Sequence, residues 1–147
     1  GANLFRAEMQ GADLSRAEMQ GADLRGAEMQ GANLSRAEMQ GADLNRAEFD
    51  DRTSFNAATF QDAAVKEVDF TKSTIEPDQL AQMFGDASVT LPGGKGPDSK
   101  GWPNHWSNET LGWRGDESRS PFHQAWRAWQ DKIGFDRQTN TLKHPSK

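Results

Sequence analysis

The chain has 147 residues, of which 34% are hydrophobic and none is cysteine, and its formal net charge is −5. This length fits one ordinary domain or a repeat array with an appendage, and the missing cysteine excludes disulfides, thiolate metal sites and thiol catalysis. No apolar run approaches the length that spans a membrane. The acidic excess belongs to residues 1–75, which hold 13 acids and 8 bases, so direct binding of nucleic acid is not expected.

Residues 1–75 repeat a unit of five residues. A large apolar residue recurs in each unit, and as far as residue 47 an alanine stands two positions before it. In an α-helix, five residues advance the apolar position by about 140°, so no single face would be apolar. In a continuous strand, an odd period would send successive apolar residues to opposite faces. Each unit is therefore predicted to be a short extended piece followed by a bend, and bends of one hand would wind the chain around a narrow apolar interior.

A period of ten residues overlies the period of five. Leu alternates with Met at the apolar position, and Arg alternates with Gly at the corner position. An even number of units per coil would stack like residues on one another. The recurring A(D/N)LXX pattern resembles the pentapeptide-repeat family. This resemblance implies an all-β solenoid, a right-handed quadrilateral parallel β-helix with four units per coil, so that the fifteen units would make nearly four coils.

The apolar position of each unit predicts the interior column. Phe49 and Phe55 are six positions apart, so one residue is inserted near Asp50, Asp51 and Arg52, where a bulge or a surface loop would absorb it. The predicted core residues are Leu4, Met9, Leu14, Met19, Leu24, Met29, Leu34, Met39, Leu44, Phe49, Phe55, Phe60, Val65, Phe70 and Ile75.

The outer wall of such a coil would carry polar columns. Glutamates 20 positions apart would stack, with Glu8, Glu28 and Glu48 in one column and Glu18 and Glu38 in another. Stacked carboxylates could hold a divalent cation. Ladders of alternating charge are the preferred interpretation, because four arginines stand two positions before glutamates: Arg6, Arg16, Arg36 and Arg46. The glutamines would form amide ladders in the pairs Gln10 with Gln30 and Gln20 with Gln40.

The repeats are predicted to end at Ile75, and a short helix is predicted to run from Pro77 to Phe84. Proline suits the first helical turn, and Gly85 would stop the helix. The apolar face of this helix would lie over the open end of the last coil, because a solenoid without a cap exposes strand backbone and apolar side chains. The predicted lid residues are Leu80, Met83 and Phe84.

Residues 76–147 are predicted to form a partly helical, Trp-rich appendage to the β-helix of residues 1–75. Glycine and proline break regular structure between Gly85 and Arg119, but the tryptophans of this stretch indicate a loop that packs: Trp102, Trp106 and Trp113. The stretch resembles the tail that follows the repeats in a subset of bacterial pentapeptide-repeat proteins. That resemblance implies a bacterial protein, which is expected in the cytoplasm.

A second helix is predicted from Pro121 to Ile133, between an N-cap at Ser120 and a stop at Gly134. Spacings of four, three and four place one apolar stripe on this helix: Phe122, Trp126, Trp129 and Ile133. The stripe is expected to be buried against the cap and the Trp-rich loop. The alternative is burial against a second copy or a partner protein, for which the candidate contact residues are Trp126 and Trp129.

No recognisable catalytic motif occurs in the sequence. The three histidines, His105, His123 and His144, lie far apart and lack the spacing of a zinc site, and no phosphate loop, nucleophile elbow or dinucleotide motif is present. No catalytic, cofactor-binding or metal-binding residue is therefore predicted. The expected function is that of a non-enzymatic rigid scaffold, a module that binds another protein.

The family resemblance also implies an alternative function. Some pentapeptide-repeat proteins resemble duplex DNA in size and charge and bind DNA gyrase in its place. The second interpretation is therefore a DNA-mimicking modulator of gyrase or another type II topoisomerase. Arginines interleaved with the acids, together with the shortness of the rod, argue against it.

Gly1 stands in mid-repeat, so the chain is expected to be a fragment or a processed piece. The near identity of its first ten units is compatible with recent duplication and with consensus design. The first coil would leave strand backbone and the end of the apolar column uncovered. Leu4 and Phe5 lie at this edge, and a weak homodimer through residues 1–20 is predicted.

Overall fold

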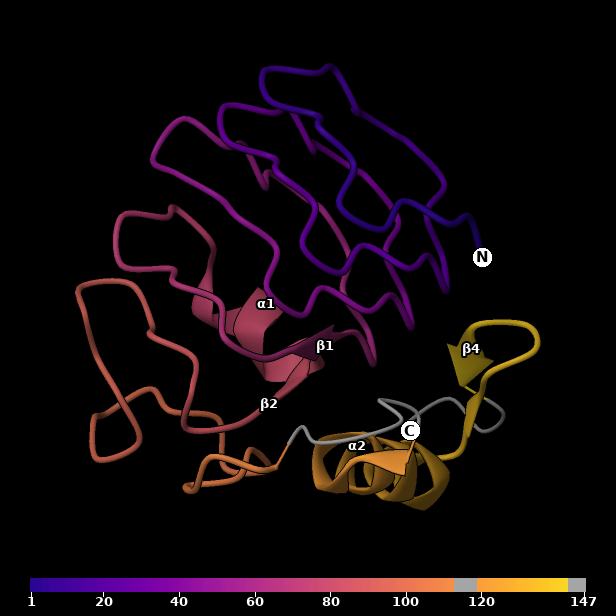
Figure 1. Ribbon diagram of the computed structural model, residues 1–147, viewed down its shortest axis with the longest axis vertical. Coiled ribbons are helices and arrows are strands. Elements are labelled where there is room, and N and C mark those ends of the chain that lie inside the picture. Colours follow the sequence, from indigo (N-terminus) through magenta and orange to yellow (C-terminus); the bar gives the residue numbers. More distant parts are fainter. Residues whose placement is uncertain (113–118, 143–147) are drawn as a thin grey trace.

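The computed structural model describes residues 1–112 and 119–142, and the predicted loop residue Trp113 and His144 lie outside these ranges. The N-terminal repeats wind into a stack of coils, and helices and strands follow below them (Figure 1). These elements are β1 (Ala64–Val65), α1 (Pro77–Gln82), β2 (Phe84–Gly85), α2 (Pro121–Ile133), β3 (Phe135–Asp136) and β4 (Thr141–Leu142).

Parallel β-bridges between residues 20 positions apart hold the first coils together, as between Asn3 and Asp23. Each turn of the chain therefore takes four five-residue units, an even number, as the alternation of Leu and Met predicts. Most corners between units have left-handed backbone, with φ between 53° at Arg6 and 71° at Gly41. Because these left-handed corners bend the chain in the same way, the apolar side chains face one axis.

The apolar column is buried below the first coil. Leu4, Met9 and Leu14 are only half-buried, because they lie in the first coil and no coil covers them. The alanines of the repeat pack between the large side chains, which keeps the interior narrow. The predicted core residues that are buried are Met19, Leu24, Met29, Leu34, Met39, Leu44, Phe55, Phe60, Val65, Phe70 and Ile75.

Phe49 departs from the prediction, because it is half-buried in the middle of the stack. Its ring stacks on that of Phe70 in the next coil with centroids 5.7 Å apart, whereas hydrogen-bonded strands lie about 4.8 Å apart. Within the described residues, no β-bridge or backbone hydrogen bond joins Glu48 to Asp69, although each is bridged to the coil on its other side. Two bulky rings in successive coils therefore hold this rung of the ladder open, beside a cavity of about 440 Å³.

The predicted insertion after Phe49 is accommodated at a corner that Asp50 and Arg52 close. The bridges that cross it span 21 positions in place of 20. The backbone N–H of Gly31 donates to Asp50 Oδ1 at 2.9 Å, whereas Gly11, at the same point of the coil before, donates to a backbone carbonyl. The hydrogen-bonded guanidinium of Arg52 lowers the pKa of Asp50 to about 2. A side-chain carboxylate thus replaces the backbone acceptor where the bulge interrupts the ladder.

Helix α1 lies against the last complete turn of the repeats. Gln79 Nε2 donates to the backbone carbonyls of Phe55 and Ala58 at 2.7 and 3.0 Å, which ties the helix to the preceding coil. Leu80 and Met83 are buried in the main core. Both side chains therefore belong to the apolar column, and their role as its lid stays a prediction.

Phe84 does not belong to this helix, contrary to the prediction. The backbone is already extended at Met83 (φ −91°, ψ 167°), and Phe84 begins β2, which pairs in parallel with β1 with Ala64 opposite Phe84. Its side chain packs on α2 in a second apolar cluster. The ladder therefore continues past Ile75, where the repeats were predicted to end, and the division of the chain at residue 75 stays a prediction.

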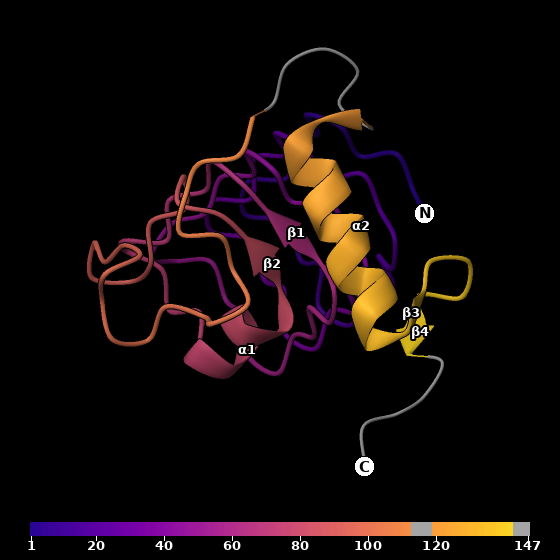
Figure 2. The same ribbon diagram turned by 90° about the horizontal axis from the view of Figure 1, so that it is seen from below.

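Helix α2 begins and ends at the predicted residues. Ser120 Oγ accepts the backbone N–H of His123 at 3.2 Å, and Gly134 ends the helix with a left-handed φ of 77°. The helix lies along the side of the coils, beside β1 and β2 (Figure 2). Trp126 Nε1 donates to the backbone carbonyl of Asp62 at 2.9 Å. Of the predicted apolar stripe of α2, Phe122 and Trp126 are therefore buried against the chain's own wall, whereas Trp129 and Ile133 are half-buried.

The Trp-rich loop packs, as its composition predicts. Trp102 and Trp106 are buried in the main core, edge to face with centroids 5.2 Å apart. Trp106 Nε1 also donates to the backbone carbonyl of Met83 at 2.8 Å. On the other side of the loop, the ring of His105 stacks on Trp129 of α2 at 4.7 Å. The loop thus contacts both Met83, at the end of α1, and Trp129 of α2.

Candidate interaction surfaces

The polar columns of the wall stack as predicted, but their side chains bond differently. The bridged glutamates are Glu8, Glu28 and Glu48 in one column and Glu18 and Glu38 in another. Gln20 Nε2 donates to Glu38 Oε2 at 2.5 Å and Gln30 Nε2 to Glu48 Oε2 at 2.6 Å, and Gln10 donates to Glu28 in the same way. The predicted ladder of Gln with Gln is therefore wrong for Gln10 and Gln20, and the ladder of alternating charge stays a prediction. Each glutamine follows a glutamate by two positions, so its amide reaches the carboxylate of the next coil directly.

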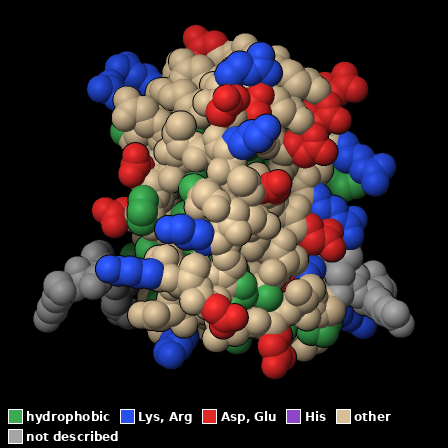
Figure 3. Space-filling view, turned by 90° about the vertical axis from the view of Figure 1, so that its left-hand side faces the viewer, with side chains coloured by type: hydrophobic (Ala, Val, Ile, Leu, Met, Phe, Trp, Pro, Cys, Tyr) green, Lys and Arg blue, Asp and Glu red, His purple; other side chains and the backbone are tan. Residues whose placement is uncertain are grey.

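Ion pairs of the repeats lie elsewhere on the wall. Arg46 Nε is 2.5 Å from Glu67 Oε2, and Arg25 Nη2 is 2.7 Å from Asp23 Oδ2. On the face of the molecule in Figure 3, basic and acidic side chains are interspersed, and no single sign of charge covers the surface. The repeats thus present a surface of mixed charge.

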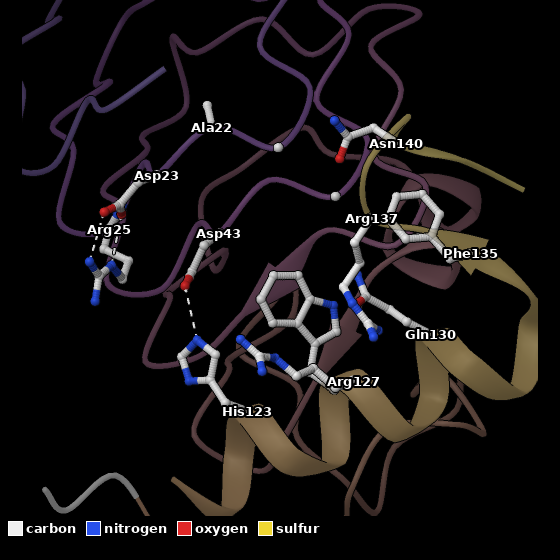
Figure 4. A pocket seen from close by; sticks show the side chains of 13 residues that line it. Ala22, Asp23, Arg25, Asp43, His123, Arg127, Gln130, Phe135, Arg137 and Asn140 are labelled. Atoms are coloured by element: carbon white, nitrogen blue, oxygen red, sulfur yellow. Dashed lines mark hydrogen bonds and ion pairs between the residues drawn. The ribbon is translucent and has the colours of Figure 1, made fainter. Parts of the chain in front are cut away.

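A cleft of about 350 Å³ separates the wall from α2 and from the β3–β4 hairpin (Figure 4). On the wall side, Asp23 accepts two hydrogen bonds of 2.7 Å from Arg25, which lower the pKa of Asp23. Asp43 Oδ2 accepts a 3.3 Å hydrogen bond from His123 Nε2, 80 positions away along the chain. The helix and the hairpin contribute the other side of the cleft: Trp126, Arg127, Gln130, Phe135, Arg137 and Asn140. Sequence reasoning missed this cleft, because nothing in the local pattern pairs the repeats with α2.

Ser120, His123 and Asp43 form a hydrogen-bonded row that resembles a hydrolase triad. His123 Nδ1 lies 3.3 Å from Ser120 Oγ, and His123 Nε2 lies 3.3 Å from Asp43 Oδ2. Ser120 is only 1% exposed, however, and its Oγ caps α2. Both contacts are also longer than the roughly 2.6–3.2 Å of a nucleophile and its base. A substrate cannot reach this hydroxyl, so the row fastens α2 to the wall.

His105 also has a structural role. Its Nε2 donates to the backbone carbonyl of Met83 at 2.5 Å, and burial lowers the pKa of its imidazole.

Among residues 1–112 and 119–142, no three His, Cys, Asp or Glu side chains are grouped so as to hold a metal ion. No helix in that same part of the chain has the length and apolar character needed to cross a bilayer.

The β3–β4 hairpin rests on glycines of the repeat. A Cβ added to Gly41 would lie 2.7 Å from Asn140 Oδ1 and 2.9 Å from Phe135 Cζ, and one added to Gly21 would lie 2.9 Å from Asn140 Oδ1. Gly11, on another corner of the coil, has nothing within 4 Å of such an atom. The ten-residue glycine period therefore provides a docking surface for the hairpin, a role that the sequence pattern alone did not indicate.

Replacing Gly41 by alanine is expected to detach the hairpin, whereas Gly11→Ala leaves it in place. The two glycines have similar φ values, 71° and 67°, so alanine costs about 1–2 kcal/mol of backbone strain at either position. Only at Gly41 does the new methyl group also collide with Asn140 and Phe135. Amide hydrogen exchange in β3 and β4 should therefore accelerate in Gly41→Ala alone. Equal acceleration in both variants would contradict the docking role.

Asp62 lies at the joint between α2 and the wall. Its side chain is fully buried, and within the described residues its Oδ2 has no hydrogen-bond partner. Its backbone carbonyl accepts hydrogen bonds from Trp126 and Gln130 of α2. Burial raises the pKa of the carboxyl group from 3.8 to about 6, because water cannot solvate the charged form.

Asp62 is expected to make the protein less stable as the pH rises from about 4 to about 6. Its folded-state pKa exceeds the unfolded value, so protonation stabilises the fold below this window and that stabilisation is lost above it. The shift in pKa corresponds to about 3 kcal/mol. Asp62→Asn keeps the shape and suits the left-handed backbone (φ 64°). Urea unfolding should show the variant up to about 3 kcal/mol more stable than the parent at pH 8 and equal to it at pH 4. A difference independent of pH would contradict this assignment.

The candidate contact residues of the sequence analysis differ in exposure. Phe5 is 48% exposed in the first coil, and Leu4 beside it is half-buried. Trp126 and Trp129, by contrast, pack against the chain's own wall and loop. The homodimer through residues 1–20 stays a prediction.

The repeats of this chain are similar to those of known proteins. The description "pentapeptide repeats" fits residues 1–21, 17–51 and 32–71. Among solved structures, the chain is similar to HetL, a pentapeptide repeat protein involved in heterocyst differentiation regulation from the cyanobacterium Nostoc sp. strain PCC 7120. The identity is 26% over 63% of this chain and 44% of HetL, with a TM-score of 0.30.

A second similar structure is QnrB1, a plasmid-mediated fluoroquinolone resistance protein. It is 19% identical over 74% of this chain and 66% of that chain, with a TM-score of 0.26. The chain thus spans less than half of HetL and about two thirds of QnrB1. The search of curated proteins found no match.

The assignment to a family rests on the repeated units themselves. They match the family description over residues 1–71, and their coils are joined by parallel bridges at the period of four units. This chain is therefore a member of the pentapeptide-repeat family, whose fold is a right-handed β-helix.

Proposed function

We propose that the chain is a rigid, non-enzymatic scaffold that binds a protein partner through its repeat wall. The observation that carries the proposal is the ladder of parallel bridges, which joins the coils from Asn3 to Ala64 and continues between Ala64 and Phe84 and between Asp69 and Thr90. It holds polar side chains in columns at intervals of about 4.8 Å. Because this wall is already ordered, the scaffold loses little conformational entropy when a partner binds to it. The proposed architecture is nearly four coils, closed by the Trp-rich helical cap.

The non-enzymatic part of the proposal is supported by the way the chemically capable groups are used. In the described part of the chain, the Ser120, His123 and Asp43 row is occupied in fastening α2. The glutamate columns accept hydrogen bonds from glutamines of neighbouring coils. These groups contribute to the fold and to the surface that a partner would meet.

Affinity capture with charge-reversed walls tests the proposal. The immobilised chain is compared with Glu18→Lys/Glu38→Lys and with the matched pair Glu8→Lys/Glu28→Lys, which changes a different column by the same charge. We expect the parent chain to capture a protein, and we expect one of the two variants to fail to capture it. Binding of the purified partner to the parent chain should then show that the contact is direct. Capture of nothing, or equal capture by the parent and both variants, would contradict a wall-mediated scaffold.

The stacked glutamate columns favour a second candidate, a DNA-mimicking modulator of DNA gyrase. The interspersed charges of Figure 3 weigh against it, as do the hydrogen bonds between Gln and Glu along the columns. A supercoiling assay with purified gyrase is therefore expected to show no inhibition when this protein is added at micromolar concentration. Clear inhibition that weakens steeply with added salt would reverse the ranking of the two candidates.

A further inference from the structure

The cleft beside α2 combines paired carboxylates with surplus positive charge. Asp23 and Asp43 both line it, and both already accept hydrogen bonds, from Arg25 and His123. Arg127 lines the cleft from α2 and is exposed. Within residues 1–112 and 119–142, no ion pair or hydrogen bond engages its guanidinium. The lining of the cleft therefore carries more guanidinium groups, from Arg25, Arg127 and Arg137, than carboxylates, from Asp23 and Asp43.

A second guanidinium reaches the cleft from the hairpin. Arg137 Nη1 lies 2.9 Å from Asp131 Oδ1 and 3.4 Å from Gln130 Oε1. The side chain of Asp131 is 66% exposed and does not line the cleft. An ion pair that is this exposed contributes little, so Arg137 can turn to another carboxylate at small cost. Figure 4 places Arg137 and Arg127 on the α2 and hairpin side, away from the pair of Asp23 with Arg25.

We infer that this cleft binds the carboxylate of an acidic segment of a protein partner. The inference rests on the proposed function, since it states the chemistry of one contact that a partner would make. Guanidinium groups present a planar fork of donors that matches a carboxylate. Trp126 and Phe135 add apolar surface for the methylenes of a glutamate, and a cleft of about 350 Å³ is large enough for such a side chain.

The observations favour a carboxylate over a phosphate. The wall of the cleft keeps two carboxylates, Asp23 and Asp43, which would repel a doubly charged group more than a singly charged one. The side-chain amide of Asn140 at the rim can also hydrogen-bond to the backbone of an extended peptide. A protein segment therefore fits the cleft better than a free inorganic anion does.

Fluorescence anisotropy with a labelled glutamate-rich peptide tests the inference on the full chain. The parent is compared with Arg127→Gln/Arg137→Gln and with the matched control Arg16→Gln/Arg36→Gln, which removes the same charge from corners outside the cleft lining. We expect the parent to bind, and the cleft variant to lose roughly tenfold in affinity for each arginine. The control should bind like the parent, and a peptide with glutamine in place of glutamate should not bind.

Three outcomes would overturn the inference. They are no binding by the parent, equal weakening by the cleft and control variants, and displacement of the peptide by inorganic phosphate at equal concentration. The cleft variant in the affinity capture separates this inference from the proposed function. If the cleft variant still captures a partner whose capture depends on the glutamate columns, the scaffold proposal holds and the cleft inference fails. If the peptide binds but no wall variant affects capture, the cleft inference holds and the proposal of a wall-mediated scaffold fails.

Discussion

Replacing Leu24 by aspartate is expected to leave the repeat array unfolded. Leu24 is fully buried, with coils above and below it. Truncation of such a side chain to alanine costs about 2–5 kcal/mol, and aspartate adds a buried carboxyl group without a partner. The sum is comparable to the roughly 5–15 kcal/mol by which whole domains are stable. Far-UV circular dichroism and urea unfolding would show the loss.

Two controls separate burial from other effects of the new charge. Leu4→Asp makes the same chemical change in the half-buried first coil, so it should cost clearly less than Leu24→Asp. Ser35→Asp places the charge on the outer wall, where the Oγ atom contacts Ser54 at 2.9 Å, and should cost about 1 kcal/mol. Comparable damage from all three substitutions would contradict the assignment of inside and outside.

Replacing Lys66 by methionine is expected to have the next largest effect, a loss of about 3–5 kcal/mol. Lys66 and Asp86 form an ion pair of 2.8 Å, and their side chains are 2% and 0% exposed. Methionine preserves most of the aliphatic packing but leaves the carboxylate of Asp86 buried without its counterion. The loss should appear as a lower midpoint of urea unfolding.

The double variant Lys66→Met/Asp86→Asn should recover part of this stability, because no uncompensated charge remains. Recovery should be incomplete, since Asp86 Oδ2 also accepts the backbone N–H of Leu111 at 2.9 Å, and an amide NH₂ cannot. Arg137→Met breaks an exposed ion pair and serves as the control, with an expected cost below about 1 kcal/mol. A loss of stability in Arg137→Met as large as that in Lys66→Met would contradict the role given to burial.

The interior could be predicted from the sequence to a large extent. A large apolar residue every fifth position is compatible with neither a helix face nor a strand face, and the burial of Leu24, Leu34 and Leu44 agrees with the predicted column. The bounds of α2 follow from its proline, its Ser120 cap and Gly134. These features are local, because each depends on the backbone preferences of a few neighbouring residues.

The departures from prediction arise where the outcome depends on contact between coils. Phe49 has the apolar character of a core residue, yet stacking on Phe70 leaves it half-buried beside an open rung. Phe84 continues the apolar face of a helix in the sequence, but pairing with Ala64 makes it part of a strand. In both cases an interaction with a residue about 20 positions away outweighed the local pattern.

The sequence by itself determined the five-residue unit, the composition of the apolar column and the caps of α2, because five-residue spacing and capping chemistry act within one turn of chain. Only the tertiary structure decided that α2 and the hairpin lie along the wall. That placement depends on the hydrogen bond of His123 to Asp43 and on the space above Gly41. These partners are 80 or more positions apart along the chain, and no periodic pattern links the repeats to the tail. The cleft with Arg127 and Arg137 exists for this reason alone: two independently patterned segments meet there.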